Sequence, residues 1–217
     1  MQLANSMDLR GRAKPSRRVW IPKPGKPLER RPLGIPTISC RAKQTLVKMA
    51  LEPEWEAKFE PNTYGFRPGR SCHDAMKAIF NALSQKTAYC LDADISGCFD
   101  NIKHYALLEK LNTTPTLRKT IKGWLRAGVI ENRIFQPTKS GTIQGGTISP
   151  LLACIALHGM EQYIKEALKS ELFLYRRRKY GTASQQRAQQ ALSIIFYADD
   201  FVVIHESEEI LIKAKVL

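Results

Sequence analysis

Two strand-forming stretches that carry aspartates constrain the fold of this chain more than any other feature. In the stretch YCLDADI, the two-residue period of a strand places Asp92 and Asp94 together on one face. In the stretch IIFYADDFVVI, the adjacent Asp199 and Asp200 interrupt residues that favour strands. Because aspartate is disfavoured within strands and common in turns, we expect a β-hairpin with both carboxylates at its tip. The two stretches therefore predict strands that present carboxylates at their ends.

The pair Asp199–Asp200 also has an ordinary interpretation, because an acidic dipeptide is common in solvated β-turns. Taken alone, the pair favours that interpretation. The acidic end of the other strand changes the balance, because hard cations such as Mg²⁺ take oxygen ligands and a pair of them needs about three converging carboxylates. Two cations about 3.5–4 Å apart activate an attacking oxygen and stabilise a leaving one in phosphoryl transfer. The carboxylates are therefore candidate metal ligands.

The basic charge of the chain is concentrated in two segments. The 217 residues carry a net charge of +14, and residues 1–48 contain 12 basic and 2 acidic side chains. Residues 176–190 add five basic side chains and no acidic one. Such segments are typical of a surface that binds polyanions. Nucleic acid is favoured over anionic lipid, because the first segment is rich in proline and glycine and does not resemble an amphipathic helix.

The composition disfavours membrane-spanning and secreted classes of protein. No apolar run approaches the roughly 20 residues that cross a bilayer, and the first residues contain no apolar signal segment. The five cysteines and four histidines are scattered, without the spacing of a zinc site. We therefore expect an intracellular protein whose cysteines are reduced and lie in the core.

The hydrophobic pattern alternates helices with extended hairpins, which is typical of the α+β class. Short strands are expected around residues 19–21 and 33–35, followed by helices that begin at Ser39 and after Ser71. The remaining pattern predicts helices near residues 104–111 and 116–127, an extended hairpin at 129–143, a long helix from Ser149 to Leu168, a basic loop at 176–190, and a helix from Glu208.

Several motifs resemble those of reverse transcriptases, in the same order along the chain. The segment FYADD resembles the Y-x-D-D signature, and DISGCFDNI resembles the motif in which an aromatic residue follows an aspartate by five positions. The segment GTIQGGTISP resembles the Q-G-x-x-x-S-P motif between them. Upstream, VWIPK, RPLGIP and YGFRPGRS resemble finger motifs of group II intron-encoded reverse transcriptases, or maturases. The resemblance covers residues 17–204.

This resemblance implies an RNA-directed DNA polymerase that adds dNTPs to a DNA primer on an RNA template, with group II intron RNA as a further partner. It implies two Mg²⁺ ions held by Asp94, Asp199 and Asp200. Asp94 is preferred over Asp92 because only Asp94 has Phe99 five residues further on. The implied nucleotide-binding residues are Lys23, Arg31, Phe99, Gln144 and Gly145. The implied nucleic-acid-binding residues are Arg67, Arg70, Arg176, Arg177, Arg178 and Lys179.

The resemblance also implies a division into a fingers and a palm region, with an antiparallel palm sheet packed on helices. The expected parts are a flexible basic segment at residues 1–16, fingers at 17–87 with a part that returns at 103–140, and palm at 88–102 and 141–217. We expect the palm to be incomplete at its C-terminus and the thumb to be absent, so that the chain is a truncated form with weak activity. Ile143 replaces a common proline, which we expect to loosen the loop that positions Gln144.

Two alternatives stay open. The chain is either a polymerase or a non-catalytic remnant that binds intron RNA through its basic segments. A two-metal nuclease uses the same carboxylates but gives no role to Phe99 or Gln144.

The expected location is the bacterial cytoplasm in association with the nucleoid, with an organellar origin as the other option, and no membrane partner is expected.

Overall fold

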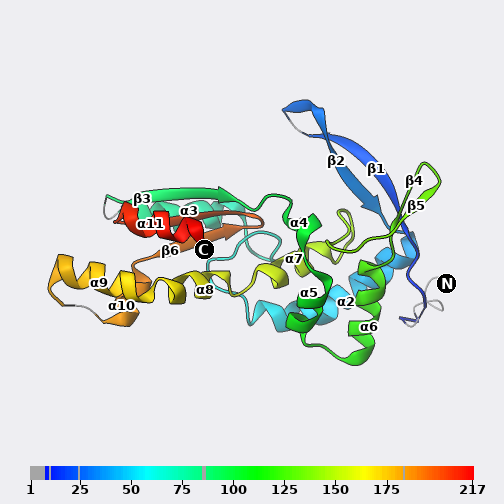
Figure 1. The fold of residues 1–217 in the computed structure, drawn as a ribbon. Coiled ribbons are helices and arrows are strands. Elements are labelled where there is room, and N and C mark those ends of the chain that lie inside the picture. Colours follow the sequence, from blue (N-terminus) through cyan, green and yellow to red (C-terminus); the bar gives the residue numbers. More distant parts are fainter. Residues whose placement is uncertain (1–7, 10, 24, 85–86, 183) are drawn as a thin grey trace. The chain divides into compact units, whose positions relative to one another are not determined.

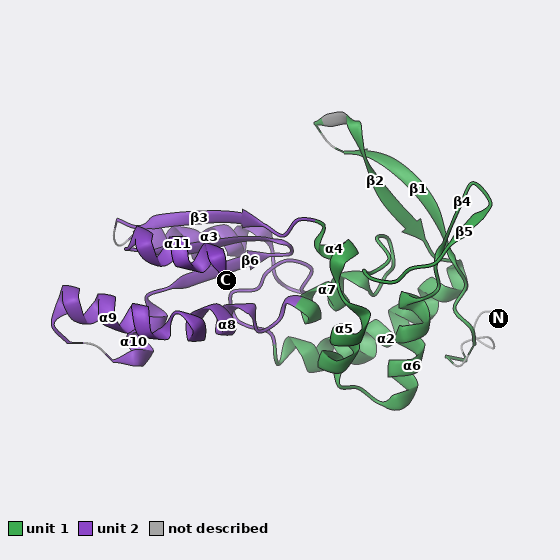
Figure 2. Cartoon of the chain, viewed as in Figure 1, with its two compact units in different colours: residues 1–58, 97–156 green, residues 59–96, 157–217 purple. Residues whose placement is uncertain are grey.

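The computed structural model describes residues 8–9, 11–23, 25–84, 87–182 and 184–217, which form two compact units (Figure 2). Unit 1 comprises residues 1–58 and 97–156, and unit 2 comprises residues 59–96 and 157–217. These units divide the chain at other points than the predicted fingers and palm, whose boundaries stay a prediction. In the segment predicted to be flexible, residues 1–16, positions 1–7 and 10 lie outside the described residues.

Unit 1 contains a sheet with the strand order β2-β1-β4-β5 (Figure 1). Strand β1 pairs antiparallel with β2 and parallel with β4. The β4–β5 turn holds Asn132 and Arg133 at positive φ, 49° and 66°, as the favoured two-residue hairpin turn requires. The elements of this unit are β1 (Ser16–Lys23), β2 (Lys26–Ile35), α2 (Ile38–Glu56), α4 (Cys98–Asn101), α5 (His104–Leu111), α6 (Pro115–Leu125), β4 (Val129–Glu131), β5 (Ile134–Gln136) and α7 (Ser149–Leu157).

Unit 2 contains an antiparallel sheet with the strand order β3-β7-β6. Strands β6 and β7 form the hairpin that the sequence predicts around its adjacent aspartates. The elements of this unit are α3 (Cys72–Ser84), β3 (Tyr89–Asp94), α8 (Met160–Ala167), α9 (Lys169–Tyr180), α10 (Gln185–Gln190), β6 (Ser193–Tyr197), β7 (Asp200–His205) and α11 (Glu208–Val216). Both units mix helices with sheets, which confirms the predicted α+β class.

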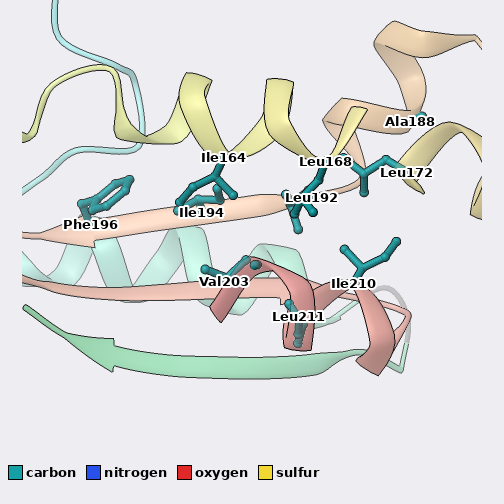
Figure 3. Packing of buried hydrophobic residues seen from close by; sticks show 11 residues of the cluster. Ile164, Leu168, Leu172, Ala188, Leu192, Ile194, Phe196, Val203, Ile210 and Leu211 are labelled. Carbon is teal, nitrogen blue, oxygen red and sulfur yellow. The ribbon is translucent and has the colours of Figure 1, made fainter. Parts of the chain in front are cut away.

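Buried side chains cover both faces of the sheet in unit 2. On one face, Ile194 and Phe196 belong to a cluster that reaches into the neighbouring helices (Figure 3). On the other face, Ile195 packs with Tyr64 and with Ala75 of α3. Because alternate residues of β6 enter different clusters, the strand is apolar on both sides, as in a central layer. The first cluster consists of Ile164, Leu168, Leu172, Ala188, Leu192, Ile194, Phe196, Val203, Ile210, Leu211 and Ala214.

Two sequence predictions for this part of the chain are wrong. The single long helix from Ser149 to Leu168 is interrupted, because Gly159 adopts a left-handed conformation (φ 86°) between α7 and α8. The basic stretch at 176–190 is not a loop but the end of α9 followed by α10. These helices form because Leu172 and Ala188 bury their side chains in the core, which the local charge pattern does not reveal.

Smaller corrections concern the start of α2 and the cysteines. Thr37, and not Ser39, caps α2, since its hydroxyl oxygen accepts a hydrogen bond from the backbone nitrogen of Cys40 (3.3 Å). Cys72 and Cys90 are exposed rather than in the core, while Cys40, Cys98 and Cys154 are buried; none of these five described residues forms a disulfide bond. Within the described residues, no helix combines the length and the apolar composition that crossing a membrane requires.

The packing of α9 gives a direct test. Leu172 is 1% exposed and Leu174, on the same helix, is 49% exposed. Leu172→Ala is expected to lower the free energy of unfolding by about 2–5 kcal/mol, because it leaves a cavity in the cluster. Leu174→Ala is expected to change it by less than about 0.5 kcal/mol. Urea denaturation of both variants measures the difference, and equal effects would contradict this placement of α9.

Candidate active site

The register of the sheet in unit 2 brings the predicted aspartates together. Asp94 is the last residue of β3 and lies directly opposite Asp200, the first residue of β7. Side chains that are opposite in an antiparallel pair have Cβ atoms about 4.5–5.5 Å apart. Asp199 occupies the turn before β7, where its carbonyl oxygen accepts a hydrogen bond from the backbone nitrogen of Ile95 (3.2 Å). Three acidic residues therefore lie at the same end of the sheet.

The electrostatic environment distinguishes these aspartates from ordinary turn residues. Burial raises the pKa of Asp200 above its usual value, and the negative charges of Asp199, Asp94 and Asp92 raise it further. The carboxylates thus repel one another, and bound positive charge would relieve this repulsion. Across the described residues, no three acidic, histidine or cysteine side chains converge closely enough to hold a metal ion. The oxygen-only donors fit a hard divalent cation, and the side chains must rotate toward one another to share one.

A preceding loop supports the aspartate-bearing turn, a feature that the sequence analysis missed. The backbone nitrogen of Tyr64 donates to the carbonyl oxygen of Phe196, and the nitrogen of Phe196 donates to that of Asn62, both at 2.9 Å. A Cβ atom at Gly65 would collide with the backbone nitrogen of Ala198 and lie 2.8 Å from its Cα. The sequence signal for this contact was Gly65, the first glycine of YGFRPGRS, because a glycine allows two backbones to approach closely.

In unit 1, the Q-G-x-x-x-S-P loop is fixed at several points. The side-chain nitrogen of Gln144 donates to both carboxylate oxygens of Asp100, at 3.2 and 3.4 Å. The Gln144 carbonyl oxygen accepts from the backbone nitrogen of Gly34 (2.6 Å), and the hydroxyl of Ser149 donates to the carbonyl oxygen of Ile143 (2.8 Å). These bonds hold the backbone of the loop on both sides of Gln144, and the expected loosening at Ile143 stays a prediction.

The other predicted nucleotide-binding residues also lie in unit 1, and their roles stay predictions. The ammonium group of Lys23 forms an ion pair with Glu29 (2.6 Å). Arg31 is exposed on β2, and Phe99 is half-buried on α4. A Cβ atom at Gly145 would lie 2.8 Å from the carbonyl oxygen of Gly34. The fold itself therefore requires glycine at this position, independently of any substrate contact.

The predicted nucleic-acid-binding residues divide into internal and exposed groups. Arg67 is only 8% exposed, and its guanidinium donates to the carbonyl oxygens of Glu60 (3.1 Å) and Thr63 (2.9 Å). Lys179 forms an ion pair with Glu206 (2.6 Å), and this hydrogen bond raises the pKa of Lys179 well above its usual value. Their contacts with nucleic acid stay predictions.

The remaining members of this set are placed differently. Arg70 lies over the ring of Tyr64, with its guanidinium carbon 5.5 Å from the ring centre, and Arg176 lies over Tyr180 at 5.1 Å. At the end of α9, Arg177 and Arg178 are exposed, together with Lys179 and Tyr180. The cationic surface is therefore smaller than the count of basic residues predicts.

A family model described as "Reverse transcriptase (RNA-dependent DNA polymerase)" matches residues 21–216. The chain belongs to the reverse transcriptase family. Enzymes of this family use divalent metal ions. The match covers both segments that carry the aspartates and confirms the family that the motifs resemble.

Two curated relatives place the chain within this family. The group II intron-encoded protein LtrA of Lactococcus lactis subsp. cremoris is 40% identical over 153 residues, covering 69% of this chain and 25% of that protein. Protein YkfC of Escherichia coli (strain K12) is 35% identical over 211 residues, covering 88% of this chain and 54% of that protein. The chain thus resembles group II intron reverse transcriptases and spans about a quarter and about half of these relatives.

Solved structures show the same fold. Apo telomerase from Candida tropicalis, truncated from its C-terminal domain, has a TM-score of 0.66 at 15% identity and covers 94% of this chain and 46% of that one. Telomerase from Candida albicans, in complex with a fragment of telomeric RNA, has a TM-score of 0.62 at 12% identity, covering 96% and 40%. These likenesses concern the fold and confirm the predicted reverse-transcriptase architecture.

The contact between Gly65 and Ala198 predicts a large effect of one methyl group. Gly65→Ala is expected to lower the free energy of unfolding by about 1–3 kcal/mol, because the backbone of the turn has to move. Gly123→Ala is the matched control, since its nearest neighbour would lie 3.9 Å away and alanine favours the helix α6. That control is expected to be neutral or stabilising. Chemical denaturation measures both, and a neutral Gly65→Ala would contradict the contact.

Proposed function

We propose that this chain acts as an RNA-directed DNA polymerase of the group II intron type, adding dNTPs to a primer 3′-hydroxyl on an RNA template. In this proposal Asp94, Asp199 and Asp200 hold two Mg²⁺ ions. The observation that carries it is the register that sets Asp94 opposite Asp200, next to Asp199 in the turn. Mutual repulsion at Asp200 supports the same assignment, because such a cluster is costly unless it binds cations.

The protein contributes position and charge to this reaction. When bound, paired divalent cations lower the pKa of the primer hydroxyl and stabilise the charge that develops on the leaving pyrophosphate. The strands β3 and β7 hold their aspartates on a sheet with buried clusters on both faces, which limits the motion of the backbone that carries the carboxylates. The hydrogen bond from Ile95 to Asp199 fixes the turn against β3. Such preorganisation contributes to rate because the reacting groups do not have to be reordered.

Further residues are proposed to bind the substrates. Lys23 and Arg31 contact the triphosphate, as cationic donors on a hairpin can, after Lys23 exchanges its partner Glu29. Phe99 packs against the sugar, and Gln144 with Gly145 contacts the nascent base pair. Similarity to an intron-encoded protein supports group II intron RNA as a partner.

The alternative of a non-catalytic RNA-binding protein shares the basic surface but gives the aspartates no role. Without bound cations, the carboxylates at the end of β3 and the start of β7 repel phosphate groups, so a protein that only binds RNA gains nothing from them. The nuclease alternative uses the same carboxylates and differs in its product. Analysis of both primer and template lengths in one reaction separates a polymerase from a nuclease.

The sharpest test compares two aspartates on the same strand. Asp94 lies opposite Asp200, whereas Asp92 lies opposite Val202. Asp94→Asn is expected to reduce Mg²⁺-dependent single-nucleotide addition at least about a hundredfold, because it removes a charged ligand. Asp92→Asn, the matched control, is expected to stay within about threefold of the unmodified chain. The assay is primer extension on an RNA template under single-turnover conditions with excess protein.

Binding of the RNA–DNA duplex, measured in parallel, is expected to remain unchanged or to tighten in both variants, since each loses a negative charge. Asp199→Asn should behave like Asp94→Asn. Equal loss of extension in Asp92→Asn and Asp94→Asn would contradict the assignment of Asp94. Loss of duplex binding in both would show that the aspartates support the fold rather than the reaction.

A further prediction concerns RNA binding by α9. The slope of log Kd against log salt concentration reports the number of phosphate contacts, about 0.7 per contact for single-stranded RNA. Arg177→Gln combined with Arg178→Gln is expected to reduce this slope by about 1. Lys179→Gln is the control and is expected to change it less, because Lys179 is paired with Glu206. Equal slopes in the unmodified chain and the double variant would exclude this helix from the RNA interface.

A further inference from the structure

Phe66 has an unusual backbone conformation for a large side chain. Its φ angle is +62°, in the left-handed region that favours glycine and asparagine, and 46% of the residue is exposed. Asparagine or glycine would adopt this conformation at lower cost than an aromatic residue. Strain of this kind is concentrated at sites of binding and catalysis, so its presence calls for a functional explanation.

The rest of the loop enforces the conformation. The buried guanidinium of Arg67 holds the carbonyl oxygens of Glu60 and Thr63 and lies 5.2 Å from the centre of the Phe59 ring. On the other side, Gly65 is packed against the backbone of Ala198. With both of its neighbours fixed inside unit 2, Phe66 is held in place rather than sampling this conformation by chance.

The same contacts place Phe66 beside the catalytic turn. Gly65 touches Ala198, which directly precedes Asp199 and Asp200. Consecutive Cα atoms are about 3.8 Å apart, so the backbone of Phe66 lies within one residue of that contact. Arg70, exposed in the same loop, adds a cation. The backbone of this loop therefore carries an exposed aromatic residue one position away from its contact with the aspartate-bearing turn.

The chemistry of this position suits a nucleobase rather than a phosphate. An uncharged aromatic ring has no favourable charge interaction with a phosphate, whereas it stacks on any base, and such stacking tolerates every sequence. We propose that the ring of Phe66 stacks on a base of the bound primer–template near the primer terminus. This inference rests on the proposed function and names a substrate contact that the motifs did not assign.

The test compares stability with duplex binding. Phe66→Asn is expected to keep or raise the midpoint of thermal unfolding, since asparagine tolerates the left-handed region. The same variant is expected to weaken binding of an RNA–DNA primer–template about tenfold. Phe66→Trp, which keeps an aromatic face, is expected to bind the primer–template like the unmodified chain. Phe80→Ala is the matched control, because Phe80 is 69% exposed on α3 of the same unit. Its duplex affinity should equal that of the unmodified chain.

A set of duplexes with single abasic sites near the primer terminus locates the stacked base. At one position, removal of the base should weaken binding by the unmodified chain but not by Phe66→Asn. If Phe66→Asn binds every duplex like the unmodified chain, the inference is overturned while the proposed function stands. A lowered unfolding midpoint with unchanged affinity also overturns it, because Phe66 would then be structural. If the unmodified chain binds no duplex, both the proposed function and this inference fail.

Discussion

The antiparallel register between β3 and β7 is the constraint on which the candidate site depends. A shift of one residue would turn every side chain of β3 to the opposite face and separate Asp94 from Asp200. The register is held by burial, since Val203 and Ile204 of β7 enter clusters on opposite faces of the sheet. The hydrophobic core thus does more than stabilise unit 2, because it also decides which carboxylates meet.

The features that follow from local sequence could be predicted, and those that depend on distant partners could not. The strand period and the turn preference of aspartate correctly placed Asp94 at the end of a strand and Asp199 in a turn, whereas Asp200 is the first residue of β7 and not part of the turn. The buried state of Arg67 depends on Phe59 and on two carbonyl groups, and the pairing of Lys179 depends on Glu206, 27 residues further along the chain. A basic residue looks the same in sequence whether it binds phosphate or a neighbouring carbonyl.

The turn that carries the aspartates is a costly piece of structure. It combines like charges with a positive φ of 61° at Ala198, and the neighbouring Phe66 has a similar conformation. A hairpin alone does not withstand such costs, because isolated two-stranded hairpins are marginally stable. Here the hairpin is anchored by the hydrogen bonds of Phe196 to the preceding loop and by two buried clusters. Stability elsewhere in unit 2 therefore permits strain where substrate is proposed to bind.

The net charge of +14 overstates the surface available to nucleic acid. Lys23, Lys165 and Lys179 are paired with carboxylates, and the guanidinium of Arg67 is directed at backbone carbonyls. Each such contact has to be exchanged before the cation can bind a phosphate, which removes part of the gain from counterion release. Exposed arginines such as Arg177 and Arg178 carry no such cost. Affinity for RNA is therefore expected to depend on where the cations lie rather than on how many the chain contains.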